Sequence, residues 1–155
     1  MIAILLLDPK YPHNVGGALR AAACFGGSTL AWTGERVADP ERWPPGARLP
    51  REERLRAYRH VRIERHDDEG CRALVDDGRV PVAVERRAQA ERLVDFVHPE
   101  RALYVFGPED GSIDKGWLHA CHRFVCIPTV NDGPLNLAAA VNVVLYDRLA
   151  KQLQG

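Results

Sequence analysis

Short apolar runs alternate with helical segments along the whole chain, and this alternation limits the possible fold more than any other feature. The clearest runs cover residues 2–7, 80–84 and 102–106. A run that is apolar throughout is typical of a strand buried on both faces. Alternating strands and helices in one domain therefore predict an α/β fold, with a parallel sheet that helices cover on both faces.

The remaining element boundaries follow from helical spacing, capping residues and Gly or Pro breaks. Gly26 and Gly27 end the first helix, and four prolines make residues 34–50 a loop or an irregular insertion. Strands are expected at residues 2–7, 28–33, 61–64, 80–84, 102–106 and 124–127. Helices are expected at residues 15–25, 51–58, 67–76, 89–96, 117–121 and 135–152.

The composition indicates one globular, cytoplasmic domain over residues 1–155. The 46% hydrophobic and 27% charged residues exclude a disordered or collagen-like chain. The apolar start lacks a basic region, so we do not expect a signal peptide, and residues 137–146 are too short to span a bilayer. The four cysteines are interpreted as reduced thiols. The spacing of His119, Cys121, His122 and Cys126 fits no standard zinc pattern, and no metal is expected.

Charge is unevenly distributed, although the chain has 21 basic and 21 acidic side chains. Residues 36–65 hold nine arginines and five acids, a local excess of four positive charges. Such a stretch could contact RNA phosphates, with Trp43 and Tyr58 stacking on bases. A solvated helix face with aromatic residues that anchor a loop explains it equally well, so both interpretations stay open.

Three loops that follow expected strands are rich in Gly, Pro, Asn and acidic residues. They cover residues 8–17, 107–114 and 129–136. Ligands of parallel sheets bind at such loops, beyond the carboxyl ends of the strands. Taken singly, each loop has a structural explanation. Glycines allow close helix packing, Arg20 could point to solvent, and Glu109 could be a turn or capping acid.

Taken together, the loops resemble the three signature motifs of the SPOUT methyltransferases, specifically the SpoU/TrmH family of RNA ribose 2′-O-methyltransferases. The matching residues are Asn14, Gly16 and Arg20; Gly107, Glu109 and Gly111; and Ile127-Pro128, Leu135-Asn136 and Tyr146-Asp147. The resemblance covers almost the whole chain and is closest to the small tRNA wobble-position (TrmL) type. One departure is Pro134, where the family usually places a serine.

The resemblance implies an α/β sheet with a deep C-terminal trefoil knot that binds S-adenosylmethionine. It assigns the cofactor to loops around five residues: Val84, Gly107, Ile127, Pro134 and Leu135. Arg20 would orient the ribose-phosphate and stabilise the developing alkoxide, with Asn14, Glu109 and Asn136 holding arginine and substrate in place. The implied partners are RNA, with tRNA as the expected substrate, and a second copy of the chain. Two alternatives remain: a SPOUT-fold RNA-binding protein without catalysis, and a SPOUT base methyltransferase.

Overall fold

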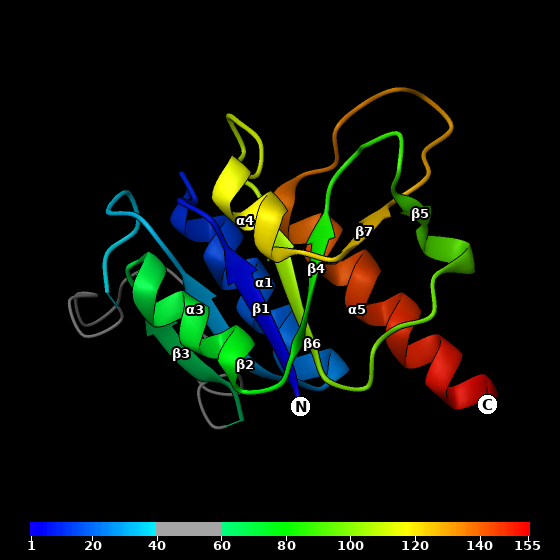
Figure 1. The fold of residues 1–155 in the computed structure, drawn as a ribbon, viewed down its shortest axis with the longest axis horizontal. Coiled ribbons are helices and arrows are strands. Elements are labelled where there is room, and N and C mark those ends of the chain that lie inside the picture. Colours follow the sequence, from blue (N-terminus) through cyan, green and yellow to red (C-terminus); the bar gives the residue numbers. More distant parts are fainter. Residues whose placement is uncertain (40–59) are drawn as a thin grey trace.

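The computed structural model, which describes residues 1–39 and 60–155, is built on one parallel sheet (Figure 1). Seven strands lie in the order β3-β2-β1-β6-β4-β7-β5, and every neighbouring pair is parallel. The strands are β1 (Ile2–Leu6), β2 (Gly27–Trp32), β3 (Arg62–Arg65), β4 (Val80–Val84), β5 (Glu91–Arg92), β6 (Ala102–Phe106) and β7 (Arg123–Cys126). The predicted α/β fold with a parallel sheet is confirmed.

Helices cover both faces of this sheet, as the buried strands predict (Figure 1). The helices are α1 (Pro12–Phe25), α3 (Asp68–Asp76), α4 (Lys115–Ala120) and α5 (Leu137–Gln154). Alternate β1 side chains divide between two cores: Ile4 packs in the core that contains α1 and α5, and Leu5 in the core that contains α3 and α4. No helix in residues 1–39 or 60–155 is long and apolar enough to cross a membrane.

Helix α1 begins three residues earlier than the sequence pattern indicates. Pro12 occupies its first turn, where the missing N–H of proline has no helical partner to lose. Gly26 ends the helix in the left-handed conformation at φ 83°, and its N–H donates to the Ala22 carbonyl. A Cβ at Gly17 would lie 2.7 Å from the Ala138 Cβ, so this glycine lets α1 pack closely against α5.

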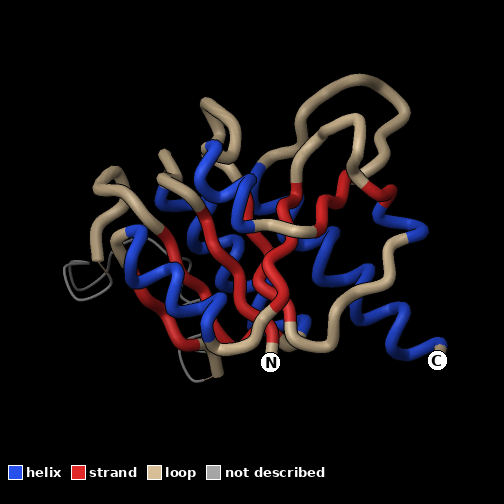
Figure 2. Tube along the Cα trace, viewed as in Figure 1, coloured by secondary structure: helices blue, strands red, loops and turns tan. Residues whose placement is uncertain are grey.

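The helix expected at residues 89–96 is wrong. Residues 91–92 form the edge strand β5, and Leu93–Asp95 form one 3₁₀ turn, η3 (Figure 2). The Lys151 ammonium, from distant α5, donates to the Leu93 and Phe96 carbonyls, which in a longer helix would accept backbone N–H groups. The other differences are shifts of one to three residues at element ends. The helix expected at residues 51–58, together with Trp43 and Tyr58, lies outside the described residues.

The carboxyl-terminal half of α5 is joined to the segment after η3 by a buried polar network around His98. The two His98 ring nitrogens lie 2.6 Å from the Tyr104 hydroxyl and 2.8 Å from Asp147 Oδ2. A carboxylate only accepts, so neutral His98 donates from Nε2 to Asp147 and accepts at Nδ1 from the Tyr104 hydroxyl. Lys151 and Arg148 complete the network by donating to backbone carbonyls of residues 93–100.

This network predicts a loss of stability in mild acid. Burial lowers the pKa of His98 and outweighs the opposing effect of Asp147, while Lys151 and Arg148 lower the pKa further. The unfolded chain therefore binds a proton more readily than the folded one below the ordinary histidine pKa of about 6.5. We expect the free energy of unfolding to decrease as the pH falls from about 6.5 towards the lowered pKa of the folded state.

Urea unfolding at pH 7.5 and pH 5.5 measures this effect, with His98→Gln as the matched control. The substitution removes the titrating group but keeps the residue polar. The wild type should lose more stability between the two pH values than His98→Gln loses. Equal losses would show that His98 does not contribute to the acid sensitivity.

Candidate functional site

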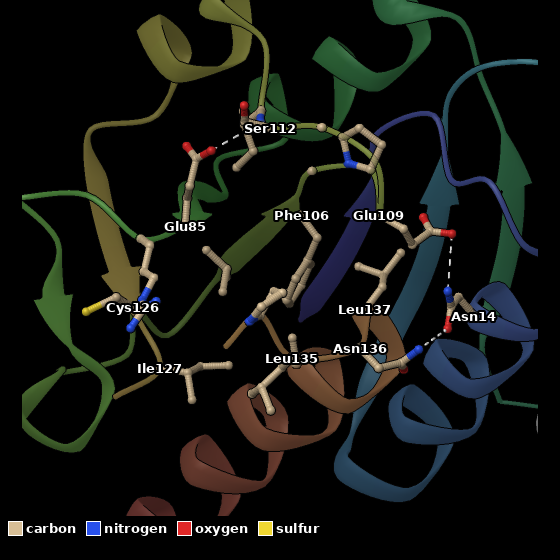
Figure 3. A pocket seen from close by; sticks show the side chains of 18 of the residues that line it. Asn14, Glu85, Phe106, Glu109, Ser112, Cys126, Ile127, Leu135, Asn136 and Leu137 are labelled. Carbon is tan, nitrogen blue, oxygen red and sulfur yellow. Dashed lines mark hydrogen bonds between the residues drawn. The ribbon is translucent and has the colours of Figure 1, made fainter. Parts of the chain in front are cut away.

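A cavity of about 490 Å³ opens at the carboxyl-terminal edge of the sheet (Figure 3). Its walls come from the segments that follow β1, β4, β6 and β7, together with the start of α5. Because all strands are parallel, their carboxyl ends meet at this edge, where ligands of such sheets bind. All five residues that the resemblance assigns to the cofactor line the cavity: Val84, Gly107, Ile127, Pro134 and Leu135.

Gly107 has a steric role in one wall of this cavity. A Cβ at this position would lie 2.9 Å from the Ile113 nitrogen and 3.0 Å from the Ser112 carbonyl carbon. Both are backbone atoms, which cannot move aside as a flexible side chain could. A glycine therefore lets the loop after β6 fold back on itself here, at the wall of the cavity.

Three polar side chains, from the start of α1, the loop after β6 and the N-cap of α5, form one hydrogen-bonded chain beside the cavity (Figure 3). The Asn14 amide donates to Glu109 Oε2 over 3.2 Å, and the Asn136 amide donates to Asn14 Oδ1 over 2.9 Å. Asn136 Oδ1 accepts the Ala139 N–H at 3.2 Å and so caps α5. Each amide orientation is fixed by its neighbour, and this hydrogen-bonded chain holds the start of α1, the loop after β6 and the start of α5 in one arrangement.

The Glu109 carboxylate also holds the start of α1. It accepts the N–H groups of Lys10 and Tyr11, both at 3.0 Å from Oε2, and Tyr11 provides no side-chain cap of its own. Burial acts to raise the pKa of Glu109, but the hydrogen bonds from Lys10, Asn14 and Tyr11 outweigh it and lower the pKa. Glu109 is thus a weak base that serves as an anchor for the loop.

Arg20 lies apart from this group within its own chain. It is exposed on α1 and does not line the cavity, whereas Asn14 in the same motif is buried and does. The step of six positions from Asn14 to Arg20 turns the helix by one full turn and about 240°, so the side chains leave it in different directions. The structure therefore brings together Asn14, Glu109 and Asn136 but leaves Arg20 outside the cavity of the same chain.

Sequence reasoning missed several residues of the cavity. Glu85 lies directly after β4, and its carboxylate accepts the Ile113 N–H at 3.4 Å (Figure 3). Arg86 pairs with Asp132 at 2.9 Å and joins two of the cavity's loops. Glu85 and Arg86 come directly after Val84, the last residue of β4, and this position in the sequence could have identified them as residues of the cavity. Tyr11 and His13 also line the cavity, although the motif around Asn14 does not include them.

The basic stretch at residues 36–65 is partly used for internal ion pairs. Arg36 binds both Asp110 oxygens, at 2.7 and 3.0 Å, and the Asp8 carbonyl at 2.6 Å. Arg65 pairs with Asp39 at 2.6 Å. These two guanidiniums fasten loops at the carboxyl edge of the sheet. Residues 40–59 of the stretch lie outside the described residues, so its RNA contact stays a prediction.

The cysteines show no grouping with other metal-ligating side chains in the part of the chain that the structure describes. No set of three His, Cys, Asp or Glu side chains there is placed to hold a metal ion. Cys71 and Cys121 are buried in the core beside α3 and α4, and burial raises the pKa of each thiol to about 12. A thiol with such a pKa stays protonated near neutral pH.

Comparison with known proteins decides the family. The model of the SpoU rRNA Methylase family matches residues 1–146, which include all three motif loops. The chain belongs to this family. Among curated proteins the chain is similar to the tRNA (cytidine/uridine/adenosine-2′-O-)-methyltransferase TrmJ of Pseudomonas aeruginosa, at 30% identity over 157 residues. That match covers 94% of this chain, and the chain spans 59% of the length of TrmJ.

Solved SpoU structures share the fold. The SpoU methyltransferase AviRb from Streptomyces viridochromogenes, in complex with AdoMet, superposes with a TM-score of 0.81 at 20% identity, covering 99% of this chain and 61% of AviRb. A structure concerned with 2-OH methylation of C/U34 on tRNA superposes at 0.77 and 26% identity, covering 100% of this chain and 97% of the other. The predicted family is confirmed, and the wobble-position subtype stays a prediction.

Proposed function

We propose that this chain binds S-adenosylmethionine in the cavity and transfers its methyl group to a ribose 2′-hydroxyl of RNA, with tRNA as the substrate. The observation that carries the proposal is the hydrogen-bonded chain of Asn14, Glu109 and Asn136 beside a cavity lined by all five expected cofactor residues. The relatives support it, since TrmJ is a tRNA 2′-O-methyltransferase and the AviRb structure is a complex with AdoMet.

The cavity suits such a cofactor. Its volume of about 490 Å³ is in the range for a drug-sized ligand. Apolar side chains such as Phe106, Ile127 and Leu137 would contact the adenine and the thioether arm, and backbone groups of the loop that begins at Gly107 would provide hydrogen bonds. Bound there, S-adenosylmethionine would supply an electrophilic methyl group on a sulfonium centre.

The side chains beside the cavity would mainly position the substrate. The reaction would form a bond between the ribose 2′-oxygen and the methyl carbon, break the carbon–sulfur bond so that S-adenosylhomocysteine leaves, and pass the 2′-hydroxyl proton to water. Methyl transfer depends strongly on alignment, which the fixed Asn14–Glu109–Asn136 chain would provide. Arg20 would act as a fixed positive charge that stabilises the developing alkoxide, rather than as a base.

We propose further that the protein is a homodimer in which Arg20 reaches the cavity of the second copy. The exposed position of Arg20 outside its own cavity supports this arrangement. Exposed apolar side chains on α5, Val143 and Tyr146, together with Leu135 before it, offer a surface beside α1 for a second copy. A protein that acts on tRNA would work in the cytoplasm.

The trefoil knot is part of the same proposal. In the sheet, β4 lies between β6 and β7, so the connection from β6 to β7 passes over β4. Residues 127–136 pass beside the connection that follows β4, and the Arg86–Asp132 ion pair joins the two (Figure 2). These features support a C-terminal segment threaded through the chain, which is rare among proteins.

Calorimetric titration with S-adenosylhomocysteine tests the cofactor assignment. We expect micromolar binding by the wild type and at least about a tenfold loss of affinity in Gly107→Val, because a branched side chain would collide with the loop backbone at this position. Thermal unfolding of both proteins controls for misfolding. Wild-type protein that is folded but does not bind S-adenosylhomocysteine would refute the cofactor assignment and favour an RNA-binding protein without catalysis.

A further inference from the structure

Two aromatic rings lie one against the other at the rim of the cavity. The rings of Tyr11 and His13 stack with centroids 5.3 Å apart and planes 23° from parallel. Both residues line the cavity and both are exposed, Tyr11 with 42% of its surface accessible. Exposed aromatic rings beside a ligand cavity present flat apolar surface, which the bases of unpaired nucleotides favour for stacking.

The backbone beneath these rings is held from both sides. Glu109 accepts the Lys10 and Tyr11 N–H groups, and Pro12 restricts the backbone between the two rings. Asn14, which follows His13, is buried and hydrogen-bonded to Glu109 and Asn136. The backbone of the ring pair is therefore held by the same hydrogen-bonded chain of Asn14, Glu109 and Asn136 that lies beside the cavity. Its position relative to these three side chains is fixed.

The polar atoms of the ring pair are unused within the described residues. Within residues 1–39 and 60–155, the Tyr11 hydroxyl and the two His13 nitrogens make no hydrogen bond. The Lys10 ammonium lies 5.4 Å from the Tyr11 ring centroid and forms no ion pair with a described residue. A stacking surface with a positive charge beside it matches a nucleotide, which carries a flat base and an anionic phosphate.

We propose that Lys10, Tyr11 and His13 form a nucleotide platform, on which the base of the methylated nucleotide stacks while Lys10 contacts an adjacent phosphate. The platform rests on the proposed function and extends it by naming positioning residues for the RNA. A base held on this pair at the cavity rim would have its own ribose directed towards the cavity. The three residues would thus act by placing the 2′-hydroxyl and would take no part in bond breaking.

Steady-state methylation of total tRNA by the full chain tests the platform. In Tyr11→Ala and His13→Ala we expect KM for RNA to rise about tenfold, because stacking on one aromatic ring contributes on that scale. We expect kcat to stay within about threefold of the wild type. Tyr11→Phe and His13→Phe keep a flat ring and should restore KM. His122→Ala, an exposed histidine before β7 at the opposite edge of the sheet, is the matched control and should change neither constant.

Direct RNA binding separates a failed platform from a failed methyltransferase. Filter binding of labelled tRNA at several salt concentrations needs no catalysis. Tyr11→Ala and His13→Ala should bind more weakly than wild type, and Lys10→Gln should reduce the salt dependence by about one released ion. Weaker RNA binding by the alanine variants supports the platform even if the wild type transfers no methyl group. A missing methyl transfer would count only against the proposed function.

Three results would overturn the platform. One is RNA binding and KM unchanged in both alanine variants. The second concerns His13→Phe. If this variant had a normal KM but a much lower kcat, and if its rate no longer fell at acid pH, His13 would be a proton-transfer group. The third is a change from dimer to monomer in the alanine variants, which would place the rings in a subunit interface.

Discussion

Replacing Arg20 with alanine should lower the rate of methyl transfer about 10²–10³-fold, the usual loss when one preorganised group that stabilises developing charge is removed. Arg20 is exposed and lies outside its own cavity, so folding and the affinity for S-adenosylhomocysteine should not change. Transfer of tritiated methyl groups to tRNA measures the first effect, and calorimetry measures the second. Near-normal transfer by Arg20→Ala would show that this side chain is not part of the machinery.

Mixed dimers test whether Arg20 acts on the cavity of the second copy. At a cofactor concentration well below the Kd of Gly107→Val, Arg20→Ala and Gly107→Val should each retain little activity alone. A dimer with one chain of each kind would combine an intact cavity from the first chain with an intact Arg20 from the second. When equal amounts of the two variants are unfolded together and refolded, half of the dimers should contain one chain of each kind. Each mixed dimer would hold one complete site of its two, so the mixture should recover about a quarter of the wild-type activity. If the refolded mixture were no more active than either variant alone, Arg20 would act in the cavity of its own chain.

Replacing Glu109 with alanine should reduce both stability and activity. The change leaves the Lys10 and Tyr11 N–H groups and the Asn14 amide without their acceptor. Lost caps and charged hydrogen bonds of this kind cost about 2 kcal/mol of unfolding free energy. Methyl transfer should fall with it, because Asn14 loses one of the two contacts that orient its side chain. Urea unfolding and methyl transfer measure the two effects.

The Glu109→Gln variant tests whether Glu109 acts only as an anchor for the loop or also as a base in the reaction. The amide oxygen of glutamine can still accept the backbone N–H groups, so this variant should keep most of the stability and remain within about tenfold of wild-type activity. Glu109 already has a lowered pKa, which makes it a poor proton acceptor. A folded Glu109→Gln protein as inactive as Glu109→Ala would instead indicate that the carboxylate itself takes the proton.

Local sequence patterns were sufficient for the sheet and for the loops that line the cavity. Apolar runs at the buried strands predicted the parallel sheet, and the Gly, Pro and Asn-rich loops after β1, β6 and β7 do meet at one edge. Glu109 is expected from its local pattern to be a turn or capping acid, and from the resemblance to hold the arginine and the substrate in place. The structure shows that it anchors the start of α1, and the sequence could not name its partners because they lie 98 and 99 residues away.

Long-range contacts also explain what the sequence did not predict. Residues 89–96 have helical spacing, but Lys151 of α5 takes the carbonyls of Leu93 and Phe96 and stabilises a strand followed by a 3₁₀ turn. Arg20 and Asn14 share one short motif, yet the turn of α1 directs them apart. Motif spacing identifies which residues act together, but it does not show whether they do so within one chain.

Mass analysis of nucleosides from RNA incubated with this protein and S-adenosylmethionine tests ribose methylation most directly. We expect the added methyl group on a ribose, recovered in alkali-resistant dinucleotides because a methylated 2′-oxygen cannot attack the adjacent phosphate. Omitting the protein and using Arg20→Ala provide the two controls. A methyl group on a base, or no transfer by protein that binds both S-adenosylhomocysteine and RNA, would contradict a ribose 2′-O-methyltransferase.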